Sequence, residues 1–240
     1  MKGADQMQER RVVNEVGVAS WFNRVYAVVG GGIAITGLIS ALLGNVYREQ
    51  YVNFIGSHQI MFYVMTFLPL ILSFFIYGKR ARANAAYASV MFVLISAAFG
   101  FTYASLWLIY PAANITAALF TTAVVFISMS VVGRTTKTDL SRAGGIAYTA
   151  LWGIILMSLV NFFIGSSGMS LLISYAVLIV FIILTAWDNQ SLKRMYMQAS
   201  GGQLDVSMNS LAIMGALQLY LDFLNLFLAI LQIFGGNDNN

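Results

Sequence analysis

The sequence predicts an all-α integral membrane protein, a bundle of seven transmembrane helices. Apolar residues make up 59% of the 240-residue chain. Charged residues make up only 9%, whereas an average soluble domain has roughly 25%. A compact soluble protein of this composition would have too little polar surface to cover its apolar bulk. Lipid is the solvent that fits, so the lipid bilayer is the first expected partner.

Seven apolar stretches follow one another along the chain, each near the ~20 residues that a helix needs to cross the hydrocarbon core. The expected spans are about 25–46, 58–78, 85–109, 113–133, 143–165, 169–188 and 208–234. Only the Gly-Ser-Ser-Gly segment 165–168 separates the fifth span from the sixth, which indicates a tight helical hairpin. Pro111 marks another short turn, between the third span and the fourth. We therefore expect a tail at 1–24 and a seven-helix transmembrane domain at 25–236.

The basic residues predict how the chain is oriented. Twelve of the 13 Lys and Arg residues lie in the tail or in the loops after the second, fourth and sixth spans, and only Arg48 lies on the opposite side. Basic residues concentrate on the cytosolic side of membrane proteins. We expect a cytosolic N-terminus and, after an odd number of spans, an outside C-terminus at 237–240. The tail mixes acids with bases, unlike a cleavable signal peptide.

The composition also excludes several kinds of site. The chain has no cysteine, so disulfides, thiolate catalysis and Cys-ligated metals are excluded. The single histidine, His58, excludes a site with several His ligands. The net charge of +4 does not indicate a nucleic-acid partner, because the basic residues are distributed over short loops instead of forming a patch.

Two of the nine acidic residues lie in predicted spans, while the other seven lie in tails or loops. Asp222 falls in the middle of the seventh span, and Asp188 lies at the cytosolic end of the sixth. A charged acid deep in the membrane costs at least about 2.5–3.5 kcal/mol, so it persists when protonated, paired or facing water. Asp188 and Asp222 are therefore the candidate functional residues. The alternative for Asp188 is an interfacial residue that caps a helix end.

The seventh span carries a small and polar stripe at the period of one helix face. Its members are Gly215, Gln218, Asp222, Asn225 and Ala229. We expect this stripe to face the bundle interior, with Gln218 and Asn225 as a polar face that supports Asp222. A structural role, in which these side chains only hydrogen-bond neighbouring helices, is the alternative.

Asp188 and Asp222 are expected at similar depths. If the sixth helix continues to a break near Gly201, Asp188 lies 13 residues before that break, about 20 Å along a helix. Asp222 lies 14 residues after Met208, about 21 Å into the seventh helix. A contact between the two carboxyls is therefore permitted. Ionising both carboxyls of such a pair is unfavourable in free energy, so the pair would hold a shared proton. The pair would then form a bistable, pH-dependent helix contact.

Two motifs contain these acids. One is Ala-Trp-Asp-Asn-Gln at 186–190, and the other is Ala-Leu-Gln-Leu-Tyr-Leu-Asp-Phe-Leu-Asn-Leu-Phe at 216–227. In both, the chain resembles the Bax inhibitor family, the transmembrane Bax inhibitor motif proteins, in its bacterial branch; Trp187 stands where that family often has Tyr. Seven spans and a cytosolic N-terminus agree with the family over essentially the whole chain.

The resemblance implies a bacterial inner-membrane protein whose last helix is central and is wrapped by the other six. It implies that Asp188 and Asp222 form a paired-aspartate pH sensor that controls a calcium leak. It also implies an arginine latch onto the first aspartate, for which Arg80 matches best and Arg82 second; the same basic loop fits a plain orientation signal.

The resemblance further implies calcium as the transported ion, together with protons as the gating signal, and no cofactor is expected. Ca²⁺ prefers six to eight oxygen ligands. Asp188 and Asp222 with Gln218 and Asn225 supply fewer, which fits a transient calcium contact and not a storage site. The chain departs from the family in two respects: the loop between the two motifs looks longer, which leaves the helix register open, and the second span carries no acid.

Other functions stay open beside a pH-gated leak. A non-conducting regulator that binds a membrane quality-control protease or other membrane proteins would use the tail 1–24. A proton-coupled transporter would also use buried acids, although no internal repeat marks a midplane substrate site.

An intramembrane aspartyl protease is disfavoured, because Leu221 precedes Asp222 without a Gly-x-Gly-Asp setting. A retinal protein is excluded, because the seventh span has no lysine. We expect no enzymatic activity and leave the oligomeric state open.

Overall fold

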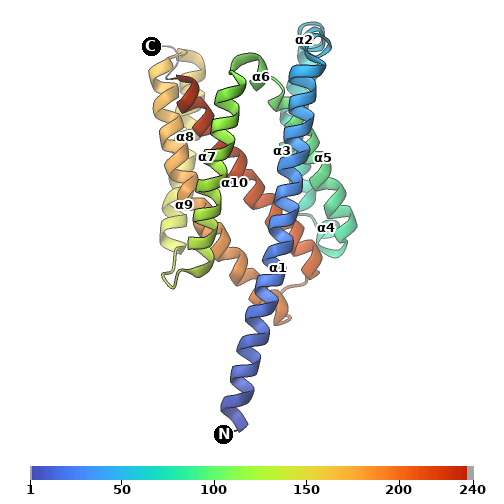
Figure 1. The fold of residues 1–240 in the computed structure, drawn as a ribbon, viewed down its shortest axis with the longest axis vertical. Coiled ribbons are helices and arrows are strands. Elements are labelled where there is room, and N and C mark those ends of the chain that lie inside the picture. The colour runs from blue at the N-terminus through green and yellow to red at the C-terminus, as the bar shows by residue number, and fades with distance from the viewer. Residues whose placement is uncertain (1, 237–240) are drawn as a thin grey trace. The chain divides into compact units, whose positions relative to one another are not determined.

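The structure, a computed structural model, describes residues 2–236, and helices form nearly all of this length (Figure 1). The elements in chain order are α1 (Lys2–Ala41), the π-helical turn η1 (Leu42–Val46), α2 (Arg48–Ser57), α3 (Gln59–Ile76), α4 (Lys79–Ala83), α5 (Ala85–Tyr103), α6 (Leu106–Ile109), α7 (Ala112–Thr135), α8 (Ser141–Ile164), α9 (Ser167–Ser200) and α10 (Met208–Gly236). No strand occurs between residues 2 and 236. The predicted all-α class is confirmed.

Among the described residues, seven helical segments are long and apolar enough to cross a membrane, as predicted. They are Val16–Val46, Gln59–Ile76, Ala85–Ile109, Ala112–Thr135, Ser141–Ile164, Ser167–Ser200 and Met208–Gly235. A helix pairs most of its backbone N–H and C=O groups internally, which the interior of a bilayer requires. The count of seven spans is confirmed.

The ends of several helices differ from the predicted spans. α1 begins at Lys2, so most of the predicted tail 1–24 is the start of a long helix. α9 continues to Ser200, twelve residues beyond Asp188, as the depth comparison assumed. The short helix α2 was not predicted; the OH of its buried Tyr51 donates a hydrogen bond to the carbonyl of Phe101 at 2.9 Å. The predicted outside tail at 237–240 lies beyond the described residues.

The chain divides into two compact units, and each is described by itself. The first unit comprises Met1–Ser40, Glu49–Thr102 and Lys193–Leu217; the second comprises Ala41–Arg48, Tyr103–Leu192 and Gln218–Asn240. In the first unit, Thr36 of α1 donates a hydrogen bond to the carbonyl of Ser96 in α5 at 2.9 Å. The indole of Trp21 in α1 donates to the carbonyl of Met208, which begins α10, at 3.1 Å.

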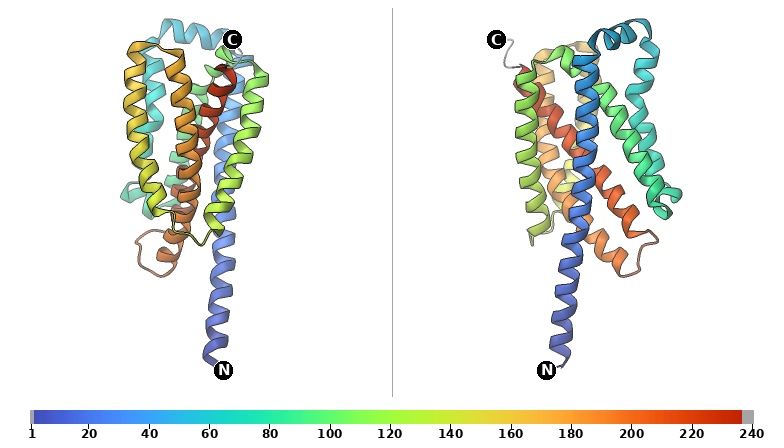
Figure 2. Two further views of the ribbon diagram at one scale, coloured as in Figure 1. Left: turned by 90° about the vertical axis from the view of Figure 1, so that its left-hand side faces the viewer. Right: turned by 45° about the vertical axis from the view of Figure 1, so that its right-hand side comes forward.

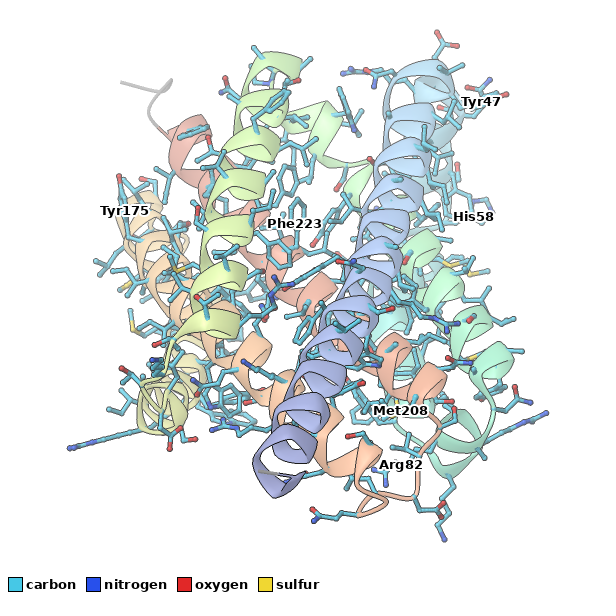
Figure 3. All side chains as sticks on the ribbon, turned by 60° about the horizontal axis from the view of Figure 1, so that its bottom comes forward. Tyr47, His58, Arg82, Tyr175, Met208 and Phe223 are labelled. Carbon is cyan, nitrogen blue, oxygen red and sulfur yellow. The ribbon has the colours of Figure 1, made fainter. Side chains whose placement is uncertain are left out.

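Besides the short elements η1 and α6, the second unit contains α7, α8, most of α9 and the C-terminal part of α10. α8 and α9 run side by side as an antiparallel pair (Figure 2), joined at Gly165, whose φ of 70° suits a residue without Cβ. Phe223 of α10 packs edge-on against Phe126 of α7, with ring centroids 5.5 Å apart (Figure 3). Ser174 of α9 hydrogen-bonds Gln232 of α10. These contacts fix the part of α10 that carries Asp222 between α7 and α9.

α10 is the most buried of the seven long apolar helices. In its apolar stretch 78% of the residues are buried, against 11–33% in the other six. A helix that is apolar on nearly all sides has this pattern when other helices surround it. A central position for α10 in the whole bundle stays a prediction, and this burial is what that position would require.

Candidate functional site

Asp188 and Asp222 lie together in the second unit. Asp188 projects from α9 and is 2% exposed, and Asp222 projects from α10 and is 4% exposed. Their side chains are hydrogen-bonded to each other, and the Asp188 carboxyl is also hydrogen-bonded to Gln218. The depth comparison permitted this contact, and the structure makes it.

The contact between the two carboxyls needs a proton, because an ionised carboxylate only accepts hydrogen bonds. One oxygen on each acid, Oδ1 of Asp188 and Oδ2 of Asp222, is buried without a hydrogen-bond partner among the described residues. A buried charge with incomplete hydrogen bonding is costly. The arrangement therefore suits a pair that holds one shared proton and is unstable with two charges.

The two residues after Asp188 fix α9 to its surroundings. The carboxamide of Asn189, which is fully buried, donates to Ser130 Oγ of α7 at 3.2 Å and to the carbonyl of Thr185 at 2.7 Å. Gln190 accepts a hydrogen bond from the backbone N–H of Leu140 and donates to the carbonyl of Thr138, both at 2.8 Å. Asp188 is thus carried by a helix that is bonded both to α7 and to the α7–α8 loop.

Two glycines allow close packing around the same stretch of α9. A Cβ added at Gly133 of α7 would collide with the carbonyl oxygen of Ala186 and would lie 2.9 Å from Cβ of Asn189. A Cβ added at Gly144 of α8 would collide with the indole of Trp187. The residues that flank Asp188 therefore pack closely against α7 and α8. A side chain larger than glycine at Gly133 or Gly144 would force these neighbours to shift.

Tyr148 of α8 completes the surroundings of the pair. Its ring packs edge-on against Trp187, with centroids 5.5 Å apart. Its phenol lies close enough to interact electrostatically with both Asp188 and Asp222. A third ionisable side chain, which was not predicted, therefore lies in the electrostatic surroundings of the pair.

The predicted supporting face is only partly as expected. Gln218 contacts Asp188, whereas the carboxamide of Asn225 donates to the carbonyl of Leu221 in its own helix at 2.8 Å. Gln218 and Asn225 are half-buried while Asp222 is buried. Burial therefore does not single out the predicted stripe as the inward face, because most of α10 is buried on every side.

The predicted latch residue lies in the first unit. Arg80 of α4 places its guanidinium 4.8 Å from the ring centroid of Tyr87, and the backbone carbonyl of Arg82 accepts a hydrogen bond from the N–H of Ser207. A latch between Arg80 and Asp188 stays a prediction.

Within the described part of the chain, no three His, Cys, Asp or Glu side chains are grouped so that they could hold a metal ion.

Sequence reasoning missed Asn189, Gln190, Gly133, Gly144 and Tyr148. Two adjacent amides after an acid in an apolar helix were a usable signal for the first two. The glycines near the ends of α7 and α8 were a weaker signal, since glycine has many uses. Nothing in the sequence associates Tyr148 with the acids, because its position relative to them depends on how α8 packs.

Comparison with known proteins agrees with the membrane-spanning helices. Residues 18–239 match the family model described as inhibitor of apoptosis-promoting Bax1. An uncharacterized membrane protein of Streptococcus pyogenes serotype M1 is 36% identical over 225 residues, 94% of this chain and 96% of that protein. The inner membrane protein YbhL of Escherichia coli K12 is 34% identical over 223 residues, 91% of this chain and 92% of that protein. The chain therefore belongs to the Bax inhibitor family of membrane proteins.

Proposed function

We propose that the protein is a pH-sensitive leak pathway for calcium and related cations, controlled by proton binding at Asp188 and Asp222. The observation that carries the proposal is the buried, hydrogen-bonded carboxyl pair between α9 and α10. Intramembrane acids are costly, so a pair of them in a protein of this size has a function by default.

Electrostatic repulsion between the two carboxylates provides the free energy for gating in this proposal. When the shared proton leaves, two negative charges face each other; at about 4 Å and an effective dielectric constant of about 20 their repulsion is ~4 kcal/mol. A free-energy change of this size shifts a two-state equilibrium about a thousandfold. Proton loss therefore favours an arrangement in which Asp188 and Asp222 no longer share a hydrogen bond, and that change alters the path for cations.

Calcium is the cargo in this proposal and not a resident cofactor. Asp188 and Asp222, with the Gln218 carboxamide beside them, offer a cation a few oxygen atoms. Calcium prefers six to eight, so water supplies the rest and the contact is brief. Brief binding is what conduction requires, because an ion must also leave.

The proposed location is the bacterial inner membrane, with the N-terminus in the cytosol and the C-terminus outside. Inner membrane protein YbhL supports the location, and the excess of basic residues on one side supports the orientation. Gln190 bonds the α7–α8 loop, which contains Lys137. The carboxyl pair then lies toward the cytosol. In this orientation Arg80 is also cytosolic, and we include it as a latch that engages Asp188 in one of the two gating states.

The test is calcium flux into liposomes as a function of pH. Wild type, Asp188→Asn and Asp222→Asn are compared with Asp205→Asn, an acid that is exposed in the α9–α10 loop. We expect a pH-dependent flux in the wild type and in Asp205→Asn, and a changed pH response in the other two. Flux equal to that of empty liposomes contradicts the leak and favours a non-conducting regulator that binds a membrane protease. An unchanged pH response in both pair variants removes the aspartates from gating.

A further inference from the structure

The second unit has a cavity at the end remote from the carboxyl pair. Its volume is about 890 Å³, and it lies among α6, α7, α8, α9 and α10. Its polar lining includes the hydroxyls and carboxamides of Tyr110, Asn114, Asn161, Ser170, Ser174 and Gln232. We call this cavity the distal pocket. The described residues that line it include no Asp, Glu, Lys, Arg or His.

Hydrogen bonds order the polar wall of the distal pocket. Ser174 of α9 donates to the carboxamide oxygen of Gln232 in α10 at 2.6 Å. Asn161 of α8 donates to Ser170 of α9 at 2.8 Å. Burial raises the pKa of Tyr110, so its phenol stays neutral. The pocket thus presents several fixed oxygen atoms and no net charge.

One face of α10 leads from the carboxyl pair to the distal pocket. In the described stretch 210–232, the residues that are not fully buried are Gln218, Leu221, Asn225, Leu228 and Gln232. Their spacing of three and four residues places them on a single helix face. Carboxamides and leucines alternate along it. This face starts at Gln218, which bonds Asp188, and ends at Gln232 in the pocket.

The distance between the two features is about half a bilayer. Asp222 and Gln232 are ten residues apart on α10, about 15 Å along a helix. Asp188 and Ser174 are 14 residues apart on α9, about 21 Å. The pair and the pocket therefore lie at different depths of one hydrocarbon core, which is about 30 Å thick.

We infer that the distal pocket is the mouth through which hydrated cations enter or leave the leak, and that the Gln218–Gln232 face of α10 lines the path from it to the carboxyl pair. This inference rests on the proposed leak function. A calcium ion with eight waters fills roughly 240 Å³, at about 30 Å³ per water, so the pocket admits it with its hydration shell. Neutral oxygen atoms replace water without trapping the ion, as a mouth requires.

The chain has no cysteine, so one introduced thiol can be probed without background. The test uses Gln232→Cys, with Ser170→Cys as a second pocket position and Tyr175→Cys as the control. Tyr175, labelled in Figure 3, follows Ser174 on α9 and is not among the residues that line the pocket. A charged, membrane-impermeant thiol reagent with a fixed positive charge is added on both sides of liposomes. Labelling is measured by mass spectrometry and calcium flux is measured before and after labelling.

We expect the reagent to label Gln232→Cys and Ser170→Cys and to lower calcium flux severalfold in both, because it places a positive charge in the mouth. The pH at which flux changes stays the same, and Tyr175→Cys keeps its flux. If neither pocket thiol is labelled in folded protein, lipid fills the pocket and the inference is wrong. If both are labelled while flux is unchanged, the pocket is wet but lies off the path. Absence of flux in unlabelled wild type overturns the proposed function, and the inference with it.

Discussion

The two ends of the second unit contrast in charge. At one end Asp188 and Asp222 are buried and hydrogen-bonded to each other, and this hydrogen bond requires a proton on one of the two carboxyls. At the other end the distal pocket is lined by neutral amides and hydroxyls, and a proton changes nothing there. Both ends join α9 to α10 by side-chain hydrogen bonds. The same two helices are therefore coupled twice, and under the proposed function pH breaks only the contact between the two carboxyls.

The largest expected effect concerns the pair itself. Replacing either acid by Asn keeps a hydrogen-bonding side chain that needs no shared proton, so Asp188→Asn and Asp222→Asn should each abolish the pH dependence of flux. Because the two residues act as one unit, the double variant should add nothing, as a double-mutant cycle measures. Flux against pH in liposomes checks this. Additive effects of the two substitutions would mean that the residues titrate independently. The end that carries Asp188 and Asp222 would then not hold a proton-dependent contact between α9 and α10.

The next effect concerns the close packing around Asp188. An alanine at Gly133 pushes α7 away from the Ala186 carbonyl, so Gly133→Ala should lower the free energy of unfolding by about 1–3 kcal/mol or more. Gly145→Ala is the matched control, because nothing lies within 4 Å of a Cβ added there. It should be neutral or stabilise by up to about 1 kcal/mol through helix propensity. Denaturant unfolding in detergent measures both, and equal stability of the two variants would contradict the close approach.

A smaller effect is expected at Gln190. Gln190→Ala removes two hydrogen bonds to the α7–α8 loop, which should cost about 1–2 kcal/mol. It should also speed hydrogen exchange at the backbone N–H of Leu140. Gln198→Ala, at an exposed position on the same helix, serves as the control and should leave that exchange unchanged. Unaltered exchange at Leu140 in Gln190→Ala would show that the loop is held by other contacts.

The smallest effect is expected at the neutral end. Ser174→Ala removes the hydrogen bond to Gln232, which should cost about 0.5–1.5 kcal/mol of stability. The pH at which flux changes should not move, because no proton binds there. Ser128→Ala is a suitable comparison, because the exposed Ser128 hydroxyl donates a hydrogen bond to the carbonyl of Val124 in its own helix at 2.7 Å. A shifted pH response in Ser174→Ala would mean that the two ends titrate as one site.

The membrane spans could be predicted from the sequence, because a helix needs about 20 apolar residues to cross a bilayer and stretches of this length are visible in the sequence. It also singled out Asp222 and Asp188, since an acid in an apolar span stands out whatever the packing. Residue counting from Gly201 and Met208 then placed the two acids at similar depths, and the structure joins them.

What the sequence could not predict depends on helix rotation and close approach. Tyr148 lies in the electrostatic surroundings of the pair because the start of α8 packs against Trp187 at Gly144. Asn225 matched the polar stripe by spacing, but its side chain bonds to its own helix. Helix periodicity assigns a residue to a face, and only the packed structure decides what that face contacts.

The proposed leak requires that the proton shared by Asp188 and Asp222 controls the flux of cations. An infrared titration of the protonated carboxyl carbonyl band, in liposomes that are also assayed for calcium flux, tests this requirement. We expect that a band present in wild type and absent from Asp222→Asn disappears over the same pH interval in which flux changes. A change of flux with pH while that band stays constant, or loss of the band with constant flux, would show that this proton does not control the flux.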